Sequence, residues 1–245
     1  MAALQIARSS CRQFYETVVP WHRIVTSVIA KTHSHSQSDA MSKIVRKVSI
    51  RNLIRADVEA VVAIHMRAFP TFFLTVLGAR FLREFYTSFL LDPVGRGFVA
   101  VDHDGQVLGA VVGPLQPSGY FRRLVRRRWW AFALSSFAAV IKKPGNVGRL
   151  LGAAFYRGES PSGPVRALLS SIAVDPAAQG RGVGRLLVER WVKEVRAMGV
   201  SGCYLTTDAE KNDRVNAFYC ELGWWLESTY QTREGRQMNR YLLDF

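Results

Sequence analysis

The sequence predicts an α/β fold in which a mixed, mostly antiparallel sheet of about six or seven strands is flanked by helices. Apolar segments at 97–101 and 106–113 enclose Asp104-Gly105, a strong signal for an antiparallel hairpin. Farther along, an apolar segment leads into a glycine-rich turn, an amphipathic helix and another apolar segment, which is the pattern of a parallel β-α-β crossover. The segments with strand patterns are 48–51, 97–101, 106–113, 168–174, 203–207, 225–230 and 237–243.

Two helices are predicted between the first and second strands. Asp57 stands where a helix begins, and apolar residues recur from there at helical spacing up to Phe69. Pro70 ends this helix, because proline has no amide donor and its ring clashes with the preceding turn. A second helix is predicted from Leu77 to Leu91. The aromatic segment 69–73 connects the two helices.

The chain has 245 residues, a net charge of +14 and a sequence pI of about 10.3. This length allows one domain, or one domain with an extension. The basic balance favours an anionic partner such as coenzyme A, a nucleotide sugar or a membrane surface, although a merely basic surface would give the same charge. No nucleic-acid-binding motif accompanies the charge, so no specific nucleic acid is expected. No Cys/His cluster has the spacing of a zinc site, so no metal is expected.

Residues 1–44 differ from the rest of the chain, because they are basic, poor in acids and polar at 32–39. We expect an N-terminal extension that is disordered or partly helical, followed by a domain at 45–245. A transit peptide and a start at Met41 are alternatives, whereas the pattern of a secretory signal is missing. The longest apolar segment, 129–141, is shorter than the roughly 20 residues that span a bilayer. We therefore expect a cytoplasmic protein, with peripheral membrane contact left open.

Residues 179–185, Gln-Gly-Arg-Gly-Val-Gly-Arg, form a glycine-rich turn before a helix predicted from Leu186 to Met198. Alternate glycines let a ligand approach the backbone, and the N-terminal end of a helix attracts anions, so the turn predicts a phosphate site. A P-loop is excluded, because Arg185-Leu186 follows the last glycine in place of Lys-Ser/Thr. A dinucleotide site is disfavoured, because Arg185 stands where the third glycine belongs, although Asp208 could serve as its acid.

The segment Gln179-Gly180-Arg181-Gly182-Val183-Gly184 resembles the Gln/Arg-x-x-Gly-x-Gly/Ala motif of the GCN5-related N-acetyltransferase (GNAT) family. The segment 212–224 is similar to the family's late helix, Asn-x-x-Ala-x-x-x-Tyr-x-x-x-Gly-Phe, with Val215 and Trp224 as mild departures. The resemblance covers about residues 46–245. It implies the GNAT fold with splayed parallel strands four and five, and a helical insertion at 114–164 between strands three and four.

The resemblance also implies acetyl-CoA as the co-substrate. In the family, backbone groups of strand four hold the pantetheine arm, the glycine-rich turn holds the pyrophosphate, and a tyrosine of the late helix protonates the departing thiolate. Tyr219 occupies the position of that general acid. It shares one helix face with Asn212 and Asn216, which lie seven and three residues before it. The expected coenzyme-binding residues are Ile172, Ala173, Val174, Gln179, Gly180, Arg181, Gly182, Val183, Gly184, Arg185, Asn212 and Asn216.

The general base is not evident from the sequence. Some members of the family carry a glutamate on strand four, but residues 166–171 contain no carboxylate. Either a water chain deprotonates the amine with help from Ser170 or Ser171, or a carboxylate elsewhere does so. His65 is expected to be an ordinary helix residue. The candidate carboxylates are Glu84, Asp102 and Asp208.

Two segments are candidates for contact with the acceptor. The predicted insertion carries five arginines beside Trp129 and Trp130. It could be a helical subdomain packed on the sheet, a lid over an anionic acceptor or an interfacial helix on an anionic membrane. In the family, the connection between the first two helices borders the acceptor, so the aromatic residues at 69–73 either grip the acceptor or pack in the core.

We therefore expect an acetyl-CoA-dependent N-acetyltransferase. Its acceptor would be a primary amine of a small molecule, with an amino sugar as one candidate, or of a peptide. The alternatives are an acyltransferase that uses a different acyl-CoA and a non-catalytic coenzyme A-binding or membrane-associated module. A homodimer, and an anionic acceptor or membrane surface at the basic insertion, are left open as further partners.

Overall fold

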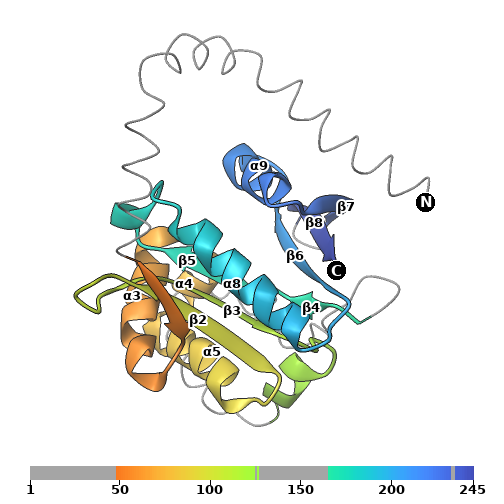
Figure 1. The fold of residues 1–245 in the computed structure, drawn as a ribbon. Helices are drawn as coiled ribbons and strands as arrows, with labels where there is room; N and C mark the ends of the chain where they lie inside the picture. Colours follow the sequence, from red (N-terminus) through yellow and green to blue (C-terminus); the bar gives the residue numbers. More distant parts are fainter. Residues whose placement is uncertain (1–47, 125, 127–164, 233–234) are drawn as a thin grey trace, which may run out of the picture. The chain divides into compact units, whose positions relative to one another are not determined.

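The computed structural model describes residues 48–124, 126, 165–232 and 235–245 (Figure 1). The predicted N-terminal extension at 1–44 and most of the predicted insertion at 114–164 lie outside the described residues. The chain divides into two compact units, of which the larger ends at Ser201 and the smaller begins at Gly202.

The larger unit is built on an antiparallel sheet with the strand order β1-β2-β3-β5. The hairpin between β2 and β3 turns at Gly105, whose φ of 80° lies in the left-handed region that glycine adopts freely. The elements in chain order are β1 (Ser49–Asn52), η1 (Arg55–Asp57), α3 (Val58–Ala68), α4 (Phe73–Val76), α5 (Ala79–Leu91), β2 (Gly95–Val101), β3 (Val107–Pro114), β4 (Ala167–Leu168), β5 (Ser171–Val174), η2 (Pro176–Ala178) and α8 (Val183–Ala197).

Helices cover both faces of this sheet (Figure 1). Successive side chains of a strand point to opposite faces. Val99 of β2 and Val112 of β3 belong to the buried cluster that α3 and α5 complete. Phe98, the neighbour of Val99, points the other way and lies under the guanidinium of Arg190 on α8, 4.2 Å from its ring centre. Helices α3 and α5 therefore pack on one face and α8 packs on the other.

Two glycines of β3 let α8 approach the sheet. A Cβ atom at Gly109 would lie 3.2 Å from the Leu187 side chain, and one at Gly113 would lie 2.9 Å from the Trp191 ring. Leu187 and Trp191 are four residues apart on α8, so they lie on the same helix face, and both are fully buried. The spacing of the glycines on the strand therefore matches the spacing of two large side chains on the helix.

The fourth predicted strand is broken into β4 and β5 by a bulge. The Ser170 N–H donates to the Val112 carbonyl (2.9 Å), although Ser171 is the residue in register with Val112. Two residues therefore oppose one on β3, which defines a β-bulge. A Cβ atom at Gly113 would lie only 2.0 Å from the Leu168 carbonyl oxygen, so the strand approaches β3 as closely as it does because residue 113 has no side chain.

The smaller unit is a three-stranded antiparallel arrangement with one helix. Strand β8 pairs with β6 on one side and with β7 on the other. The helix ends where Gly223 takes a φ of 83°, and the Trp224 N–H then donates to the Tyr219 carbonyl (3.0 Å). The elements are β6 (Gly202–Asp208), α9 (Asp213–Glu221), β7 (Trp225–Gln231) and β8 (Gln237–Asp244).

The α/β class and the positions of the predicted strands are confirmed. The described pairs within each unit are antiparallel, and the parallel arrangement predicted for the fourth and fifth strands involves segments of both units, so it stays a prediction. Two helix boundaries were wrong. The second helix begins at Ala79, after the unpredicted α4 and Gly78 with a φ of 95°, and α8 begins at Val183 instead of Leu186.

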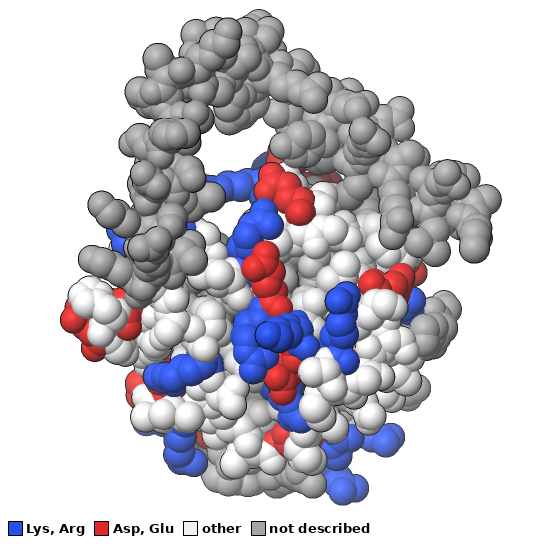
Figure 2. All heavy atoms as spheres, viewed as in Figure 1, with Lys and Arg blue, Asp and Glu red and all other residues white. Residues whose placement is uncertain are grey.

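The charged surface of the larger unit is of mixed sign. On α8, Arg190 pairs with Glu194 (2.9 Å) and Arg185 lies 3.8 Å from Glu189. Figure 2 shows basic and acidic atoms interspersed across the face in view. Among the residues described, helices are too short or too polar to cross a lipid bilayer.

Replacing Gly113 with Ala tests the close approach at the bulge. The new methyl group would collide with the Leu168 carbonyl at 2.0 Å and the Trp191 ring at 2.9 Å, so the free energy of unfolding should fall by about 3 kcal/mol. Urea denaturation measures the change. Gly97→Ala is the matched control in β2, where the nearest atoms are movable side-chain atoms of Leu53 and Val112 at 3.0 and 3.1 Å. Equal urea midpoints for the two variants would contradict this account.

Candidate active site

The predicted glycine-rich turn follows β5 in the larger unit and is anchored at its start. One oxygen of Asp175 accepts the Ala177 N–H (3.0 Å), which caps η2. The other oxygen accepts a hydrogen bond from the Arg67 guanidinium of α3 (2.5 Å). The hydrogen bond from Arg67, and to a smaller extent the one from the Ala177 N–H, hold the pKa of Asp175 below its ordinary value. This carboxylate therefore stays charged at neutral pH. The turn is thereby tied to α3.

The turn then enters α8 through two left-handed glycines. Gly180 and Gly182 have φ values of 77° and 76°, which a residue with a Cβ atom adopts only with strain. The first hydrogen bond of α8 runs from the Leu186 N–H to the Gly182 carbonyl (3.1 Å). The amides of Val183 and Gly184 precede this bond and point out of the positive end of the helix. The exposed backbone of the turn and these amides can bind an anionic group such as a phosphate.

Two predicted arginines flank the same turn. Arg181 lies between the two left-handed glycines and is exposed. Arg185 is also exposed, and its guanidinium lies one helical turn from the Glu189 carboxylate, at 3.8 Å. Their charge adds to the partial charge of the helix end, and guanidinium groups bind phosphate oxygens with two parallel hydrogen bonds.

Ile172, Ala173 and Val174 were predicted to bind the coenzyme through their backbone groups, but these groups do not all point to the same side of β5. The Asp175 N–H donates to a carbonyl of β3 (2.8 Å), and in an antiparallel pair such bonds fall on alternate residues. Ala173 therefore faces β3, whereas Ile172 and Val174 direct their backbone groups to the other side. The Val174 carbonyl accepts a hydrogen bond from the side-chain amide of Gln179 (3.3 Å). Ile172 and Val174 can thus offer backbone groups to a ligand, while Ala173 uses its own in the sheet.

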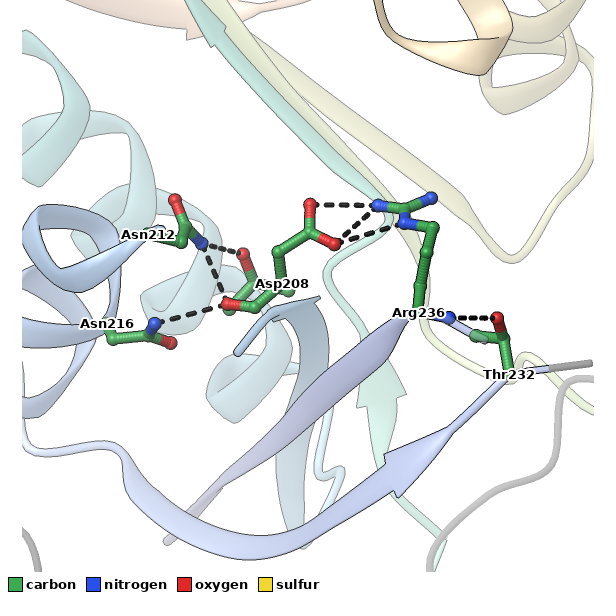
Figure 3. A network of polar contacts seen from close by, with 6 residues as sticks. Asp208, Asn212, Asn216, Thr232 and Arg236 are labelled. Atoms are coloured by element: carbon green, nitrogen blue, oxygen red, sulfur yellow. Dashed lines mark hydrogen bonds and ion pairs between the residues drawn. The ribbon is translucent and has the colours of Figure 1, made fainter. Parts of the chain in front are cut away.

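In the smaller unit, the two predicted asparagines of the late helix converge on one carbonyl (Figure 3). The side-chain amide of Asn212 donates to the Asp208 carbonyl (3.0 Å) and to the Thr207 hydroxyl (2.8 Å). The side-chain amide of Asn216 donates to the same carbonyl (3.1 Å). These bonds fasten the start of α9 to the end of β6, so both amide groups have a structural role.

Asn216 is further engaged on its oxygen side. This buried oxygen accepts hydrogen bonds from the Tyr241 hydroxyl (3.1 Å) and from the Asn239 amide (3.3 Å). The polar groups of the Asn216 side chain are therefore satisfied inside the smaller unit. The prediction that Asn216 binds the coenzyme stays a prediction, and its contacts assign this residue to holding α9 against β6 and β8.

Tyr219 lies one turn after Asn216 on the same helix face, as its spacing predicted. It is buried, with 5% of its surface exposed, among the rings of Trp224 and Tyr241 at 5.9 and 6.2 Å. Burial raises the pKa of the Tyr219 hydroxyl well above its ordinary value, because the phenolate would lose its hydration. The hydroxyl therefore carries its proton throughout the physiological range, as a general acid must.

Two of the three carboxylates considered as the general base are occupied. Asp208 forms a bidentate ion pair with Arg236 (2.6 and 2.8 Å; Figure 3). Asp102 accepts the backbone N–H groups of Asp104 and Gln106 in the β2–β3 turn (3.0 and 2.8 Å). Asp102, Asp104 and His103 also form the one group in the described residues that could hold a metal ion, but the last two are exposed and Asp102 serves the turn. Glu84, the remaining candidate, lies on α5.

His65 was not recognised as a functional candidate from the sequence, and its surroundings are unusual. It is 1% exposed, and its Nδ1 lies 2.7 Å from the Tyr86 hydroxyl. Its Nε2 has no hydrogen-bond partner among the described residues. Burial lowers the pKa of His65 to about 4, so the imidazole is neutral at physiological pH. The sequence offered no signal for this, because one histidine on an apolar helix face resembles an ordinary core residue.

The aromatic connection between α3 and the following helices lies beside His65. The rings of Phe69 and Phe72 are 5.1 and 6.2 Å from the imidazole, centre to centre. Phe69 is 37% exposed and Phe72 is 39% exposed. Each of these two side chains therefore packs on a buried residue and also presents apolar surface to solvent, and their contact with an acceptor stays a prediction.

Comparisons with known proteins agree with this geometry. A profile of the acetyltransferase (GNAT) family matches residues 58–224, which is more than half of the chain. A stretch of 53 residues is 43% identical to a mycothiol acetyltransferase of Nocardia farcinica, and it covers 22% of this chain and 17% of that protein. The chain thus spans about a sixth of the length of this relative.

Two solved structures illustrate the likeness of fold. A protein of Desulfovibrio desulfuricans assigned to the GNAT family aligns with a TM-score of 0.54 at 18% identity, covering 80% of this chain and 98% of that one. Ard1 of Thermoplasma volcanium aligns with a TM-score of 0.51 at 14% identity, covering 81% of this chain and 97% of that one. At such identities the likeness concerns the fold alone.

The neutral, buried state of His65 predicts a pH dependence of stability. The pKa is about 4 in the folded chain and near 6.5 when unfolded, so the unfolded state binds more protons between these values. The free energy of unfolding should therefore fall as the pH drops from 6.5 to 4, by up to about 3 kcal/mol from this residue.

Urea denaturation of the wild type and of His65→Asn, measured across this pH window, checks that expectation. The asparagine amide can replace Nδ1 as a partner of Tyr86 and does not titrate. The variant should lack the part of the pH dependence that His65 contributes. Parallel curves for the two proteins would contradict the assignment.

Proposed function

Because this chain belongs to the acetyltransferase (GNAT) family, we propose that it transfers an acetyl group from acetyl-CoA to a primary amine of a small molecule or a peptide. The observation that carries the proposal is the left-handed glycine turn at the positive end of α8, directly after the edge of β5. A coenzyme A molecule needs an anion site for its pyrophosphate and backbone partners for its amide-containing arm. The glycine-rich turn offers the anion site, and the edge of β5 directly before it offers the backbone partners.

On the donor side, the larger unit supplies the binding groups. The pyrophosphate is bound by the amides around Gly180 and Gly182 and at the start of α8, with charge from Arg181 and Arg185. The pantetheine arm, which carries amide groups, takes hydrogen bonds from the outward-facing backbone of Ile172 and Val174. Arg67 acts indirectly, because its ion pair with Asp175 fixes where the turn begins.

Acetyl transfer requires that the amine nitrogen attacks the thioester carbonyl, forms a C–N bond and breaks the C–S bond. The departing thiolate takes up one proton, and the amine gives up its own. Tyr219 supplies the proton to the thiolate, because its hydroxyl stays protonated and its helix position matches the family's acid. Asn212 and Asn216 support it by fastening α9 to β6.

For the acceptor, we favour a small amine over a protein. A curated relative bears the name mycothiol acetyltransferase, although the match covers a short stretch. The part-exposed rings of Phe69 and Phe72 would pack on the apolar part of such an amine. An amino sugar remains one candidate acceptor within this class.

Calorimetric titration with acetyl-CoA tests the donor site. The wild type should bind it, and Gly182→Ala should weaken binding at least tenfold, because the left-handed turn at the helix start would be strained and displaced. Gly199→Ala is the matched control, since Gly199 has a similar φ of 72° just beyond the other end of α8, with open space around it. Absence of binding to the wild type at millimolar acetyl-CoA would refute the donor assignment, and equal binding by both variants would remove the turn from it.

Tyr219→Phe tests the general acid. Removing the hydroxyl should lower kcat by about 100-fold and leave the dissociation constant for acetyl-CoA nearly unchanged, because the proton is needed only when the thiolate departs. Initial rates of thiol release are measured with an amine panel of glucosamine, an alkyl diamine and a peptide with a free N-terminus. Tyr204→Phe, which alters another buried tyrosine of the smaller unit, is the control for stability. If Tyr219→Phe keeps the wild-type kcat, another group protonates the thiolate.

A further inference from the structure

A chain of hydrogen-bonding groups crosses the larger unit from β5 to α3. The Ser171 hydroxyl lies 3.3 Å from the Tyr86 hydroxyl, and the Tyr86 hydroxyl lies 2.7 Å from Nδ1 of His65. Ser171 is in register with Val112, whose side chain belongs to the cluster under α3 and α5, so Ser171 also points to that face. Three separate elements, β5, α5 and α3, thus contribute one residue each.

The two ends of this series of hydrogen-bonding groups differ in their surroundings. Ser171 lies at the bulge, next to Ile172, whose backbone groups face the open edge of β5 in this unit. At the other end, Nε2 of His65 is buried without a partner among the described residues, and the imidazole packs against the part-exposed rings of Phe69 and Phe72. A buried nitrogen without a hydrogen bond destabilises the fold, so its retention calls for a function.

The hydrogen bonds that link Ser171, Tyr86 and His65 can be donated in either direction. In one state, Ser171 donates to Tyr86, Tyr86 donates to Nδ1, and the proton of the imidazole is on Nε2. In the other state, Nδ1 donates to Tyr86, Tyr86 donates to Ser171, and Nε2 is bare. The imidazole is neutral in both states, because burial lowers its pKa to about 4. Conversion from the first state to the second moves one proton from the Ser171 end to the Nε2 end.

We propose that Ser171, Tyr86 and His65 form a proton relay that carries the proton of the acceptor amine away from the β5 edge to water at the Phe69–Phe72 surface. This inference rests on the proposed acetyl transfer, and it fills the role of the general base, for which Asp102 and Asp208 are occupied. In this proposal Ser171 is the catalytic residue of the relay, because it is the member that takes the proton from the amine. Tyr86 and His65 act through Ser171.

The step is balanced in atoms and charge. As the amine nitrogen forms its bond to the acetyl carbon, one N–H bond breaks and its proton goes to the Ser171 oxygen. The Ser171 proton moves to the Tyr86 oxygen, the Tyr86 proton moves to Nδ1, and the Nε2 proton leaves to a water molecule. Since each transfer accompanies the next, neither a serine alkoxide nor an imidazolium accumulates, and the low pKa of His65 does not oppose the reaction.

Two arginines on the packed elements are held in ion pairs. Arg67 of α3 binds Asp175 beyond β5, and Arg83 of α5 binds Glu59 of α3 (2.5 Å each). Within the described residues, the titratable group of α3 that contacts Tyr86 is His65. The pH dependence of the relay should therefore follow the amine and His65.

Nitrogen NMR of ¹⁵N-histidine-labelled protein tests the relay without any acceptor. A working relay needs both neutral tautomers, so the two nitrogens of His65 should show averaged chemical shifts from pH 6 to 9. Tyr86→Phe should shift this average, whereas Tyr120→Phe should not. Tyr120 is the matched control, because its buried hydroxyl bonds Ser88 of the same helix α5 at 2.7 Å and does not reach β5. A single fixed tautomer of His65 in the wild type would overturn the proposal.

Kinetics with the best acceptor of the amine panel provide the second readout. Tyr86→Phe, Ser171→Ala and His65→Asn should each lower kcat by about 100-fold at pH 7, with acetyl-CoA binding unchanged and with activity recovering as hydroxide becomes available. His65→Asn is informative because it keeps a partner for Tyr86 but has no second ring nitrogen. Tyr120→Phe and Ser88→Ala should retain the wild-type kcat.

The outcomes separate the relay from the acetyltransferase activity. A wild type that acetylates amines, together with Tyr86→Phe that keeps the wild-type kcat from pH 6 to 9, would overturn the relay and leave the proposed function intact. A wild type that binds no acetyl-CoA would refute the proposed function, and the tautomer measurement would still decide whether the hydrogen bonds of His65 can reverse.

Discussion

The hydrogen bond from the Ser170 N–H to the Val112 carbonyl determines how the functional groups of the larger unit are placed. It inserts one additional residue into the strand, and every following residue of β5 is turned accordingly. Ile172 and Val174 therefore direct backbone groups to the open edge, and Ser171 points toward α3 and α5. Without the bulge, the register would shift by one residue. The Ser171 side chain would then point to the other face of the sheet, and the backbone groups of Ile172 and Val174 would point toward β3.

This bulge depends in turn on side chains that are missing from β3. Gly113 admits the Leu168 carbonyl on one side and the Trp191 ring on the other, and Gly109 admits Leu187. The same residues thus permit the break in the strand and the close packing of α8. Since α8 begins at the glycine-rich turn, the position of the proposed anion site is set by the way in which the helix packs on β3.

Much of this arrangement could be predicted from the sequence, because its signals are local. Asp104-Gly105 predicts a hairpin, alternate glycines before an amphipathic helix predict an anion site, and Asn212, Asn216 and Tyr219 share a face by their spacing. The remaining features depend on contacts between distant segments. The bulge needs Val112 and Ser170 together, and the distinction between Ala173 and its neighbours follows from it. The link from His65 through Tyr86 to Ser171 joins three elements, so no single stretch of sequence reveals it.

The central claim is that the turn after β5 and the edge of β5 bind acetyl-CoA together. Backbone amide chemical shifts, recorded during titration with acetyl-CoA, test it most directly. We expect the largest changes at the amides of Ile172 and Val174 and at residues 180–184, with little change at Ala173, whose amide is bonded to β3. Changes confined to other parts of the chain, or equal changes at Ala173 and its two neighbours, would contradict the account.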